Sequence, residues 1–321
     1  MPFDVPGTTN LLKIEALYRA AIEPSAVSRK LVRLSSWRSH HAGLTLTGSD
    51  SHRSRLTADG PRMRLTFLGT GTSFGVPQIG CDCAVCRSED PRDRRSRSGA
   101  LLESDGNVIL IDTPPELRLQ MLGAGLSRVD AVLYTHEHAD HVNGIDDLRI
   151  FSVRQRRPIP CHGPAETLER VRSGFPYIFD DAVRPYEGTS KPQLDLQPLE
   201  PGREVTIAGI RVLPLAFRHG HLRVFGYRFG PLAYITDVKA VAEAERAHLA
   251  QLKVLVLNAL WWRPHPTHMS IGEAIDTARA VGAERTYLTH LTHETGHALL
   301  AQQLPEGIFP AYDGLTVEVG E

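Results

Sequence analysis

Four side chains that can bind a metal ion lie within the stretch 135–141, which reads Thr-His-Glu-His-Ala-Asp-His. They are His136, His138, Asp140 and His141, and they come directly after an apolar run that predicts a buried strand. Imidazole and carboxylate together are ligands of zinc, iron or manganese in hydrolytic sites, unlike the thiolates of structural sites. Histidines can also gather on a solvated loop, but three histidines and an aspartate at a strand end are hard to obtain by chance. The motif therefore predicts a hydrolytic metal centre.

Three more candidate ligands follow predicted strands later in the chain, namely His219, Asp237 and His290. Each of them taken alone is more often structural than functional. Side chains at strand ends have directions that the sheet holds fixed, so sites are often built there. Together with the first motif they make five histidines and two aspartates. That number of ligands is enough to hold two metal ions with a bridging carboxylate.

Three of the four cysteines, Cys81, Cys83 and Cys86, fall within six residues. The first residues of the chain lack the basic and apolar regions of a secretory signal, so this spacing favours a metal site over a disulfide framework. A redox role is the alternative, although the sequence offers no resolving partner. Cys161 follows a short apolar run, and we expect it to be a buried structural thiol.

Composition favours an ordinary globular protein. Of the 321 residues, 41% are hydrophobic and 23% are charged, and the formal net charge is −1, so no overall charge attracts nucleic acid or an acidic membrane. No apolar run is long enough to span a membrane, and we expect a cytoplasmic protein. Residues 1–62 hold nine Lys/Arg against five Asp/Glu. We expect a basic, disordered N-terminal extension there, or an over-long start with Met63 as the true initiator, and a folded domain over 63–321.

Strands and helices occur in both halves of that domain, which suits two sheets sandwiched between helices. Residues 175–197 lack clear periodicity and are expected to be an irregular segment that could cap the site. The expected strands are 65–67, 100–103, 108–112, 129–134, 204–217, 224–229, 232–236, 252–257, 286–288 and 315–319. One helix is expected with Pro114 or Pro115 in its first turn. Further helices are expected at 144–155, 163–172, 240–252, 270–281 with Ser270 as N-cap, and 294–303.

The motif His136-x-His138-x-Asp140-His141, followed by His219, Asp237 and His290, resembles the metallo-β-lactamase fold superfamily from Met63 to about Val319. This resemblance implies an α/β fold, the αββα sandwich of two mixed β-sheets flanked by helices. A more specific resemblance is to the PhnP-type cyclic phosphodiesterases. It is carried by the Leu-Gly-Thr-Gly opening at 68–71, the three cysteines, the Thr289-His290-x-x-His293 element and His268.

The resemblance implies a role for each of these residues. The first catalytic metal takes His136, His138 and His219, and the second takes Asp140, His141 and His290, with Asp237 bridging the two. A structural zinc takes Cys81, Cys83, Cys86 and His293, a ligand set that closes a tetrahedron and leaves no open position. Asp140, Asp112 and His268 are the expected catalytic residues. Asp112 supports the site without binding metal, and His268 contacts the phosphate and assists the leaving group, although His265 is close enough to be confused with it.

The activity that the resemblance implies is hydrolysis of a small cyclic phosphodiester, similar to phosphoribosyl 1,2-cyclic phosphate, by a metal-bridging hydroxide. Two divalent ions, zinc or manganese, and one structural zinc are the expected cofactors. The expected partner is a small molecule rather than nucleic acid or a membrane, and a homodimer is a possible assembly. The run at 258–263 differs from the Asp-Cys-Ser-His run of the carbon–phosphorus lyase pathway enzyme, which leaves the substrate open. Its Trp261 and Trp262 either pack at the rim or form a wall for a sugar or base.

Three alternatives share parts of this pattern. A tRNA 3′-processing nuclease of the tRNase Z type uses the same ligands, but it needs a basic surface and a protruding arm. A glyoxalase-type thioester hydrolase shares the histidine motif but has no cysteine site. A non-catalytic binding or carrier protein similar to PqqB would lack catalytic ligands, whereas all seven positions are filled in this sequence.

Overall fold

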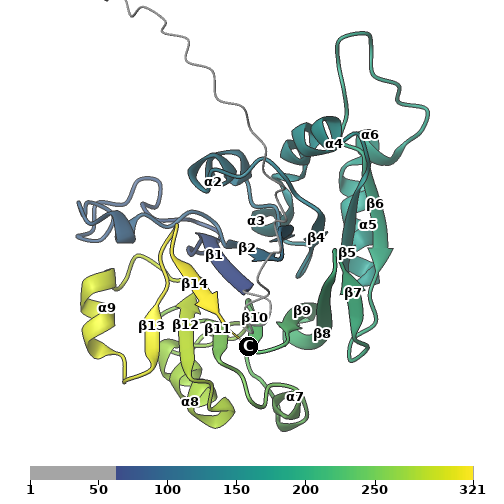
Figure 1. The fold of residues 1–321 in the computed structure, drawn as a ribbon. Coiled ribbons are helices and arrows are strands. Elements are labelled where there is room, and N and C mark those ends of the chain that lie inside the picture. The colour runs from purple at the N-terminus through teal and green to yellow at the C-terminus, as the bar shows by residue number, and fades with distance from the viewer. Residues whose placement is uncertain (1–62, 321) are drawn as a thin grey trace, which may run out of the picture. The chain divides into compact units, whose positions relative to one another are not determined.

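The computed structural model describes residues 63–320, which form two seven-stranded sheets (Figure 1). The first sheet has the order β14 (Thr316–Val319), β1 (Met63–Gly69), β2 (Gly99–Ser104), β3 (Asn107–Ile111), β4 (Ala131–Leu133), β5 (Ile159–Gly163), β6 (Leu194–Pro198). The second has the order β13 (Ile308–Pro310), β12 (Arg285–Thr289), β11 (Val254–Asn258), β10 (Leu232–Ile235), β9 (Leu222–Phe229), β8 (Ile210–His219), β7 (Val205–Ile207). Both sheets are mixed, each with three antiparallel and three parallel pairs.

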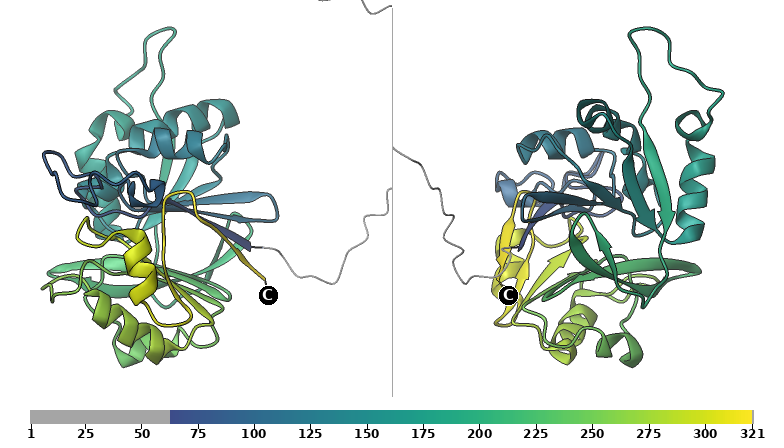
Figure 2. Two further views of the ribbon diagram at one scale, coloured as in Figure 1. Left: turned by 90° about the vertical axis from the view of Figure 1, so that its left-hand side faces the viewer. Right: turned by 45° about the vertical axis from the view of Figure 1, so that its right-hand side comes forward.

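Helices lie on the outer sides of the paired sheets (Figure 2). Those that precede β7 are η1 (Pro91–Asp93), α2 (Leu117–Gly123), α3 (Ala139–Val142), η2 (Ile145–Leu148), α4 (Arg149–Gln155), α5 (Ala165–Gly174) and α6 (Pro176–Phe179). Those that follow β10 are α7 (Glu243–Ala247), α8 (Ile271–Val281) and α9 (His297–Gln303). One apolar cluster lies between the two sheets. A second cluster joins one sheet to its helices, and a third joins the other sheet to its helices. The predicted αββα sandwich is therefore confirmed.

The β3 strand shows why these segments form central strands. Its side chains Ile109 and Ile111 belong to the cluster between the sheets, whereas Val108 and Leu110 belong to the cluster beneath the helices. A strand that is buried on both faces reads as a continuous apolar run rather than an alternating one. The strand ends at Ile111, where the apolar run gives way to Asp112.

Helix α8 begins and ends where the sequence predicts. The Ser270 hydroxyl accepts a hydrogen bond from the Glu273 backbone N–H at 3.2 Å, and the Glu273 carboxylate accepts from the Ser270 backbone N–H at 2.7 Å. This reciprocal capping box satisfies two N–H groups of the first turn. Gly282 ends the helix with a φ of +71°.

Several expected elements differ from the structure, among them the strand expected at 204–217, which is divided into β7 and β8. The helix expected at 240–252 covers only 243–247. The apolar residues of 240–252 are buried at its two ends, at Val241 and at Leu249 and Leu252, whereas α7 itself buries none of its residues. The helix expected at 144–155 is divided into η2 and α4. The segment 175–197 is not wholly irregular, since it contains α6 and the start of β6, an edge strand whose half-exposed residues leave a weak pattern.

The loop between α6 and β6 projects from the body of the fold (Figure 1). None of the residues 175–197 lines the cavity at the candidate site described below. The expected extension at 1–62 lies outside the described residues. Within the described part of the chain, no helix combines the length and apolar character that a membrane span requires.

A glycine-rich loop follows β1 and lies directly against the segment 95–97. A Cβ atom on Gly69 would lie 2.0 Å from the Arg97 carbonyl oxygen, and one on Gly71 would lie 2.6 Å from the Arg95 carbonyl oxygen. Side chains cannot be accommodated at such distances, so glycine is required at both positions. The glycines thus bring the loop backbone against a neighbouring segment.

The Arg95 side chain is completely buried and connects two segments that are far apart in sequence. Its guanidinium donates to the backbone carbonyl oxygens of Thr292 and Thr295, and to the Asp93 carboxylate at 3.2 Å. Asp93 in turn accepts from the backbone N–H of His297 at 2.7 Å. These bonds hold the chain that follows β12 against the segment that precedes β2.

We expect Arg95→Met to lower the free energy of unfolding by about 3 kcal/mol, because it leaves Asp93 and two carbonyl groups buried without their partner. The control is Arg64→Met, whose ion pair with Glu103 is partly exposed and should contribute less than about 1 kcal/mol. Urea-induced unfolding of both variants measures the difference. Equal losses would contradict the structural role of Arg95.

Candidate metal centres

The seven residues of the predicted catalytic centre come together at the ends of four strands. His136 and His138 lie in the loop after β4, and Asp140 and His141 lie in α3, the short helix that follows. His219 is the last residue of β8, Asp237 follows β10, and His290 follows β12 directly. The ligand atoms of each of three groups lie within 4.8 Å of one another: His136, His138 and His219; Asp140, His141 and His290; His136, His141 and Asp237. The structure thus gathers the predicted set, while its role in metal binding stays a prediction.

Asp112 lies beneath this group and is fully buried. Its carboxylate accepts hydrogen bonds of 2.8 Å from the Thr135 backbone N–H, from the Thr135 hydroxyl and from His141 Nδ1. Burial raises the pKa of Asp112. The contact orients the His141 ring and leaves its Nε2 atom facing the group.

Two other histidines are oriented in the same way through Nδ1. The Thr135 hydroxyl gives its proton to Asp112, so it accepts the hydrogen of His136 Nδ1, which lies 3.0 Å away. His219 Nδ1 lies 3.2 Å from the Thr267 carbonyl oxygen and must donate to it. Both rings are left with an unprotonated Nε2, the form that binds metal ions.

Three residues of the site have left-handed backbone conformations. The φ angles are +62° at Asp112, +59° at Asp237 and +59° at His290. Such angles are unfavourable for residues with a Cβ, and they cluster at functional sites where surrounding contacts enforce them. Each of the three follows a strand of the fold, so the turn aims a side chain across the strand ends.

Buried nitrogen atoms without hydrogen-bond partners test whether a metal ion fits here. Among residues 63–320, His141 Nε2 and His290 Nε2 are both buried and make no hydrogen bond. His290 Nε2 lies 2.9 Å from one oxygen of Asp237, and His141 Nε2 lies 3.5 Å from the other. Buried polar atoms are normally satisfied, and these atoms face one another as ligands around an ion do. The donor set fits a divalent metal.

Charge at the site favours the same assignment. Burial, followed by the charge of His141, lowers the pKa of His136 well below its usual range, which keeps this imidazole neutral. Burial raises the pKa of Asp237, but the charges of His290 and His141 outweigh burial, and its net pKa lies well below the usual range. A neutral imidazole and an ionised carboxylate are the forms that bind metal. Burial lowers the pKa of His141, but the charges of Asp237 and Asp112 outweigh burial and hold it well above its usual range, so an ion bound there must displace a proton.

The structure separates the two histidines that the sequence could not tell apart. His268 Nε2 lies 3.1 Å from Asp237 Oδ1, and its ring stacks on His290 with centroids 4.9 Å apart. His265 lies one step further out, with its Nδ1 atom 3.2 Å from His268 Nδ1. His268 is therefore the one that reaches the predicted metal centre.

A cavity of about 300 Å³ opens over this group. Its floor is made by the histidines and aspartates, and its sides come from the loop after β1 and the segment after β11. Residues on those sides include Thr72, Ser73, Phe74, Leu260 and Trp261, and Thr292 from the chain after β12 also lines the cavity. Sequence reasoning did not identify Phe74 or the Thr267 carbonyl group. An apolar ring within a glycine-rich loop was a usable signal for Phe74, whereas a backbone contact leaves none for Thr267.

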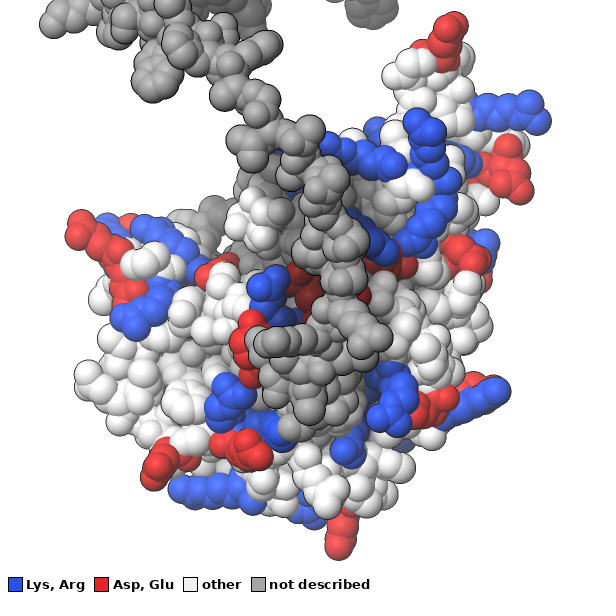
Figure 3. All heavy atoms as spheres, viewed as in Figure 1, with Lys and Arg blue, Asp and Glu red and all other residues white. Residues whose placement is uncertain are grey.

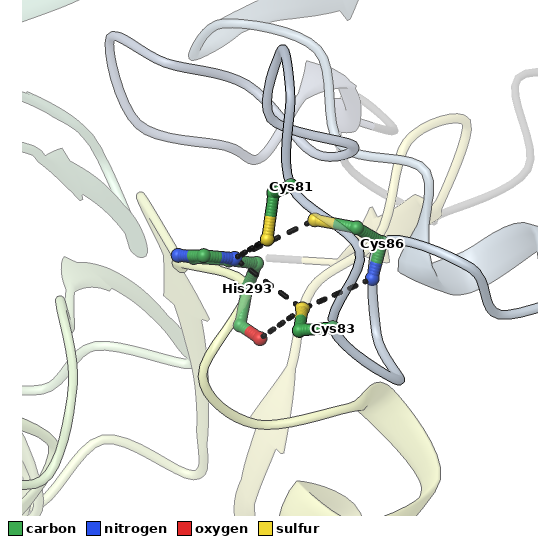
Figure 4. A group of neighbouring side chains, drawn as sticks. All are labelled: Cys81, Cys83, Cys86 and His293. Carbon is green, nitrogen blue, oxygen red and sulfur yellow. Dashed lines mark hydrogen bonds between the residues drawn. The ribbon is translucent and has the colours of Figure 1, made fainter.

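The three cysteines and His293 form a second cluster (Figure 4). His293 Nδ1 lies 3.2, 3.4 and 3.5 Å from the sulfur atoms of Cys81, Cys83 and Cys86. Zinc bonded to sulfur and nitrogen at tetrahedral angles would separate those atoms by about 3.5 Å. The four residues therefore fit a closed zinc site.

Two thiols of this cluster have shifted pKa values. The Cys86 backbone N–H donates to the Cys83 sulfur at 3.4 Å and lowers the pKa of Cys83 to about 6. Burial raises the pKa of Cys86 to about 11, so a bound ion must displace its proton. The fourth cysteine, Cys161, is fully buried in β5, as the sequence predicts.

Comparison with known proteins assigns the family. Residues 107–291 match the family model described as a beta-lactamase superfamily domain, so fold and match together define a hydrolase of the metallo-β-lactamase fold. The chain is also 38% identical to a solved structure described as a new diphosphatase from the PhnP family, with a TM-score of 0.75. That alignment covers 81% of this chain and 98% of the other. The chain therefore belongs to the metallo-β-lactamase superfamily and, within it, to the PhnP family.

Two curated relatives carry other names. A Porphyromonas gingivalis protein named octanoyltransferase is 42% identical over 265 residues, which are 81% of this chain and 52% of that protein. A ribonuclease Z from a Bradyrhizobium species is 32% identical over 170 residues, which are 51% of this chain and 49% of that protein. The chain spans about half the length of these two relatives, so neither name gives it an activity.

We expect Cys86→Ser to remove one equivalent of bound zinc and to lower the melting temperature, because a hydroxyl is a much poorer zinc ligand than a thiolate. The control is Cys161→Ser, which alters a buried thiol outside the cluster and should leave the zinc content unchanged. Metal analysis of both purified variants provides the measurement. Loss of the same zinc equivalent from both would refute the assignment.

Proposed function

We propose that this protein is a dinuclear metal-dependent phosphodiesterase that hydrolyses a small cyclic phosphodiester, of which phosphoribosyl 1,2-cyclic phosphate is the simplest candidate. The observation that carries the proposal is the pair of ligand groups, His136, His138 and His219 on one side and Asp140, His141 and His290 on the other, with Asp237 between them. The cavity of about 300 Å³ suits a small ester. The description of the solved relative as a diphosphatase supports a phosphoryl substrate.

Two divalent ions held by these groups would supply a hydroxide at neutral pH and would polarise the phosphoryl oxygens. The chain's own residues perform the remaining tasks. Asp112 holds His141 in one orientation, and the Thr267 carbonyl does the same for His219. These contacts keep the Nε2 atoms directed at the centre throughout the reaction.

His268 is the residue we assign to the leaving group. Opening a cyclic ester releases an alkoxide, which needs a proton. The His268 ring is mostly buried, lines the cavity and has His265 at its other nitrogen. Its Nε2 atom, which lies 3.1 Å from Asp237 Oδ1, would give this proton, while His265 and Thr267 contact Nδ1.

The similarity to a ribonuclease Z over half of the chain makes a nuclease the second candidate. A nuclease binds the phosphate backbone through a basic surface. On the face visible in Figure 3, Lys and Arg side chains are interspersed with Asp and Glu over the described residues. The small cavity of about 300 Å³ favours a small substrate over RNA.

The proposal is tested with metal-loaded protein and 5-phosphoribosyl 1,2-cyclic phosphate, with precursor tRNA as a parallel substrate. We expect hydrolysis of the cyclic ester, and we expect His138→Ala to lower kcat/KM by about 10³-fold, because one metal ion loses a ligand. The control is His221→Ala, an exposed histidine outside the cavity. Cleavage of the tRNA alone would favour the nuclease, and no cleavage by fully loaded protein would reject both.

The role of His268 has its own test. His268→Ala should lower kcat for the cyclic ester by about 10²-fold, but it should change the hydrolysis of bis(4-nitrophenyl) phosphate far less, because nitrophenolate leaves without a proton. His265→Ala should show a smaller version of the same pattern. The metal content of each variant must match that of the parent protein for the comparison to be valid. An equal loss on both substrates would show that His268 does not act as the acid.

A further inference from the structure

A second cavity lies between helix α2 and strands β1 and β14, apart from the candidate catalytic cavity (Figure 1). Its volume is about 550 Å³, compared with about 300 Å³ for the cavity at the predicted metal ligands, and no residue lines both. Leu119 and Leu126 give it apolar surface, and three acidic side chains and one amide give it polar surface. The proposed function does not use this cavity, so a ligand bound there is independent of that activity.

The Gln120 side chain lines this cavity in one fixed orientation and leaves an acceptor without a partner. Its amide nitrogen donates to the Ser96 hydroxyl at 2.9 Å and to the Arg97 carbonyl oxygen at 3.0 Å, which uses both of its hydrogen atoms. The Oε1 atom of the same amide is buried and makes no hydrogen bond to any described residue, and Gln120 as a whole is 8% exposed. Buried polar atoms are normally paired, so this oxygen indicates a missing donor.

Glu116 offers a second acceptor of the same kind, one helical turn from the first. Its Oε1 atom accepts from the Arg97 guanidinium, whereas its Oε2 atom is buried and has no partner among the described residues. Glu116 caps the start of α2, and its carbonyl accepts from the Gln120 backbone N–H at 3.0 Å, so the two side chains lie on the same side of the helix. Both residues line the cavity. Two acceptors without donors therefore border one space.

The charge around these acceptors is negative. Among the residues that line the cavity, Glu103, Glu116 and Asp313 are acidic, and Arg64 is the one basic residue. Arg64 is already bound to Glu103 at 2.7 Å. Asp313 accepts four hydrogen bonds, all from backbone N–H and hydroxyl groups. Even with Arg97 included, the acidic side chains outnumber the basic ones, so the cavity favours a positively charged ligand.

We propose that this cavity binds an aliphatic polyamine, whose ammonium groups donate to Glu116 and Gln120 and whose methylene groups lie against Leu119 and Leu126. An ammonium group carries donors and no acceptor, which matches acceptors that lack donors. Methylene chains that end in a charge cover apolar surface in the same way as lysine side chains do. A metal ion suits the cavity less, because no three acidic, histidine or cysteine side chains of residues 63–320 gather their ligand atoms there.

Calorimetry with the full-length, metal-loaded protein in 150 mM sodium chloride tests the site, with spermidine as the probe. We expect one equivalent of spermidine to bind. We expect 1,8-octanediol, a neutral chain whose end groups have the same separation, to bind at least 10-fold more weakly, because it cannot form charge-assisted hydrogen bonds. Equal affinities for the two ligands would overturn the proposal, and so would binding of magnesium ions with displacement of spermidine.

A substitution that fills the cavity locates the binding. Gly123 lines the cavity, and a Cβ atom placed on it would have no atom within 4 Å. We expect Gly123→Leu to leave the fold intact and to lower the affinity for spermidine by at least 10-fold, because the new side chain occupies space that the ligand needs. The control is Gly174→Leu at the end of α5, where a Cβ atom has equally open surroundings outside the cavity.

A change of charge tests the chemistry of the same site. Glu116→Gln keeps the shape of the side chain and removes its charge, and we expect it to lower the affinity for spermidine by about 10-fold. The matched control is Glu169→Gln, which neutralises an exposed glutamate of α5 outside the cavity. Should Glu116→Gln fail to fold, Gly123→Leu still decides the question. Spermidine binding that is absent from the parent protein, or that is unchanged in Gly123→Leu, would reject the site.

Discussion

The carboxylate of Asp237 is the constraint on which the arrangement of the site depends. It is 2% exposed, and it touches His290 and His268 from its own half of the fold and His141 from the other half. An ionised carboxylate loses much solvation when it is buried, so it needs cationic or hydrogen-bonding partners around it. Its partner Thr236 donates one hydrogen bond of 2.6 Å. The remaining compensation must come from the histidines and from whatever ions they bind.

The fold answers this constraint through the ends of its strands. Two sheets packed face to face bring the ends of β4, β8, β10 and β12 to one place, and left-handed turns at Asp237 and His290 aim their side chains across it. These backbone conformations are unfavourable, and the burial of apolar side chains on both sides of each sheet offsets their cost in free energy. Hydrogen bonds to the Nδ1 atoms of His136, His141 and His219 then set the orientation of these three rings. Packing of the backbone, together with contacts of the side chains, therefore sets the geometry of the site.

Sequence reasoning worked where local pattern decides structure. The histidine motif, the strand-end residues and the three cysteines were predicted because each follows an apolar run or has a short fixed spacing, and the structure brings them together. The five-residue extent of α7 and the edge strand β6 depend on packing, so their own sequence does not encode them clearly. The same holds for Arg95 and for the Thr267 carbonyl, whose partners lie about 200 and 48 residues away in sequence.

One short segment links the two clusters. His290 belongs to the group that is predicted to be catalytic and His293 to the cysteine group, so only Leu291 and Thr292 separate them. Arg95 donates to the Thr292 carbonyl in this stretch, and the Leu291 N–H donates to the Thr70 carbonyl in the glycine-rich loop at 2.9 Å. That loop also carries Phe74. An ion bound by the cysteine group would therefore do more than stabilise that group: it would anchor the chain that positions His290 and, through Thr70, the loop that borders the cavity.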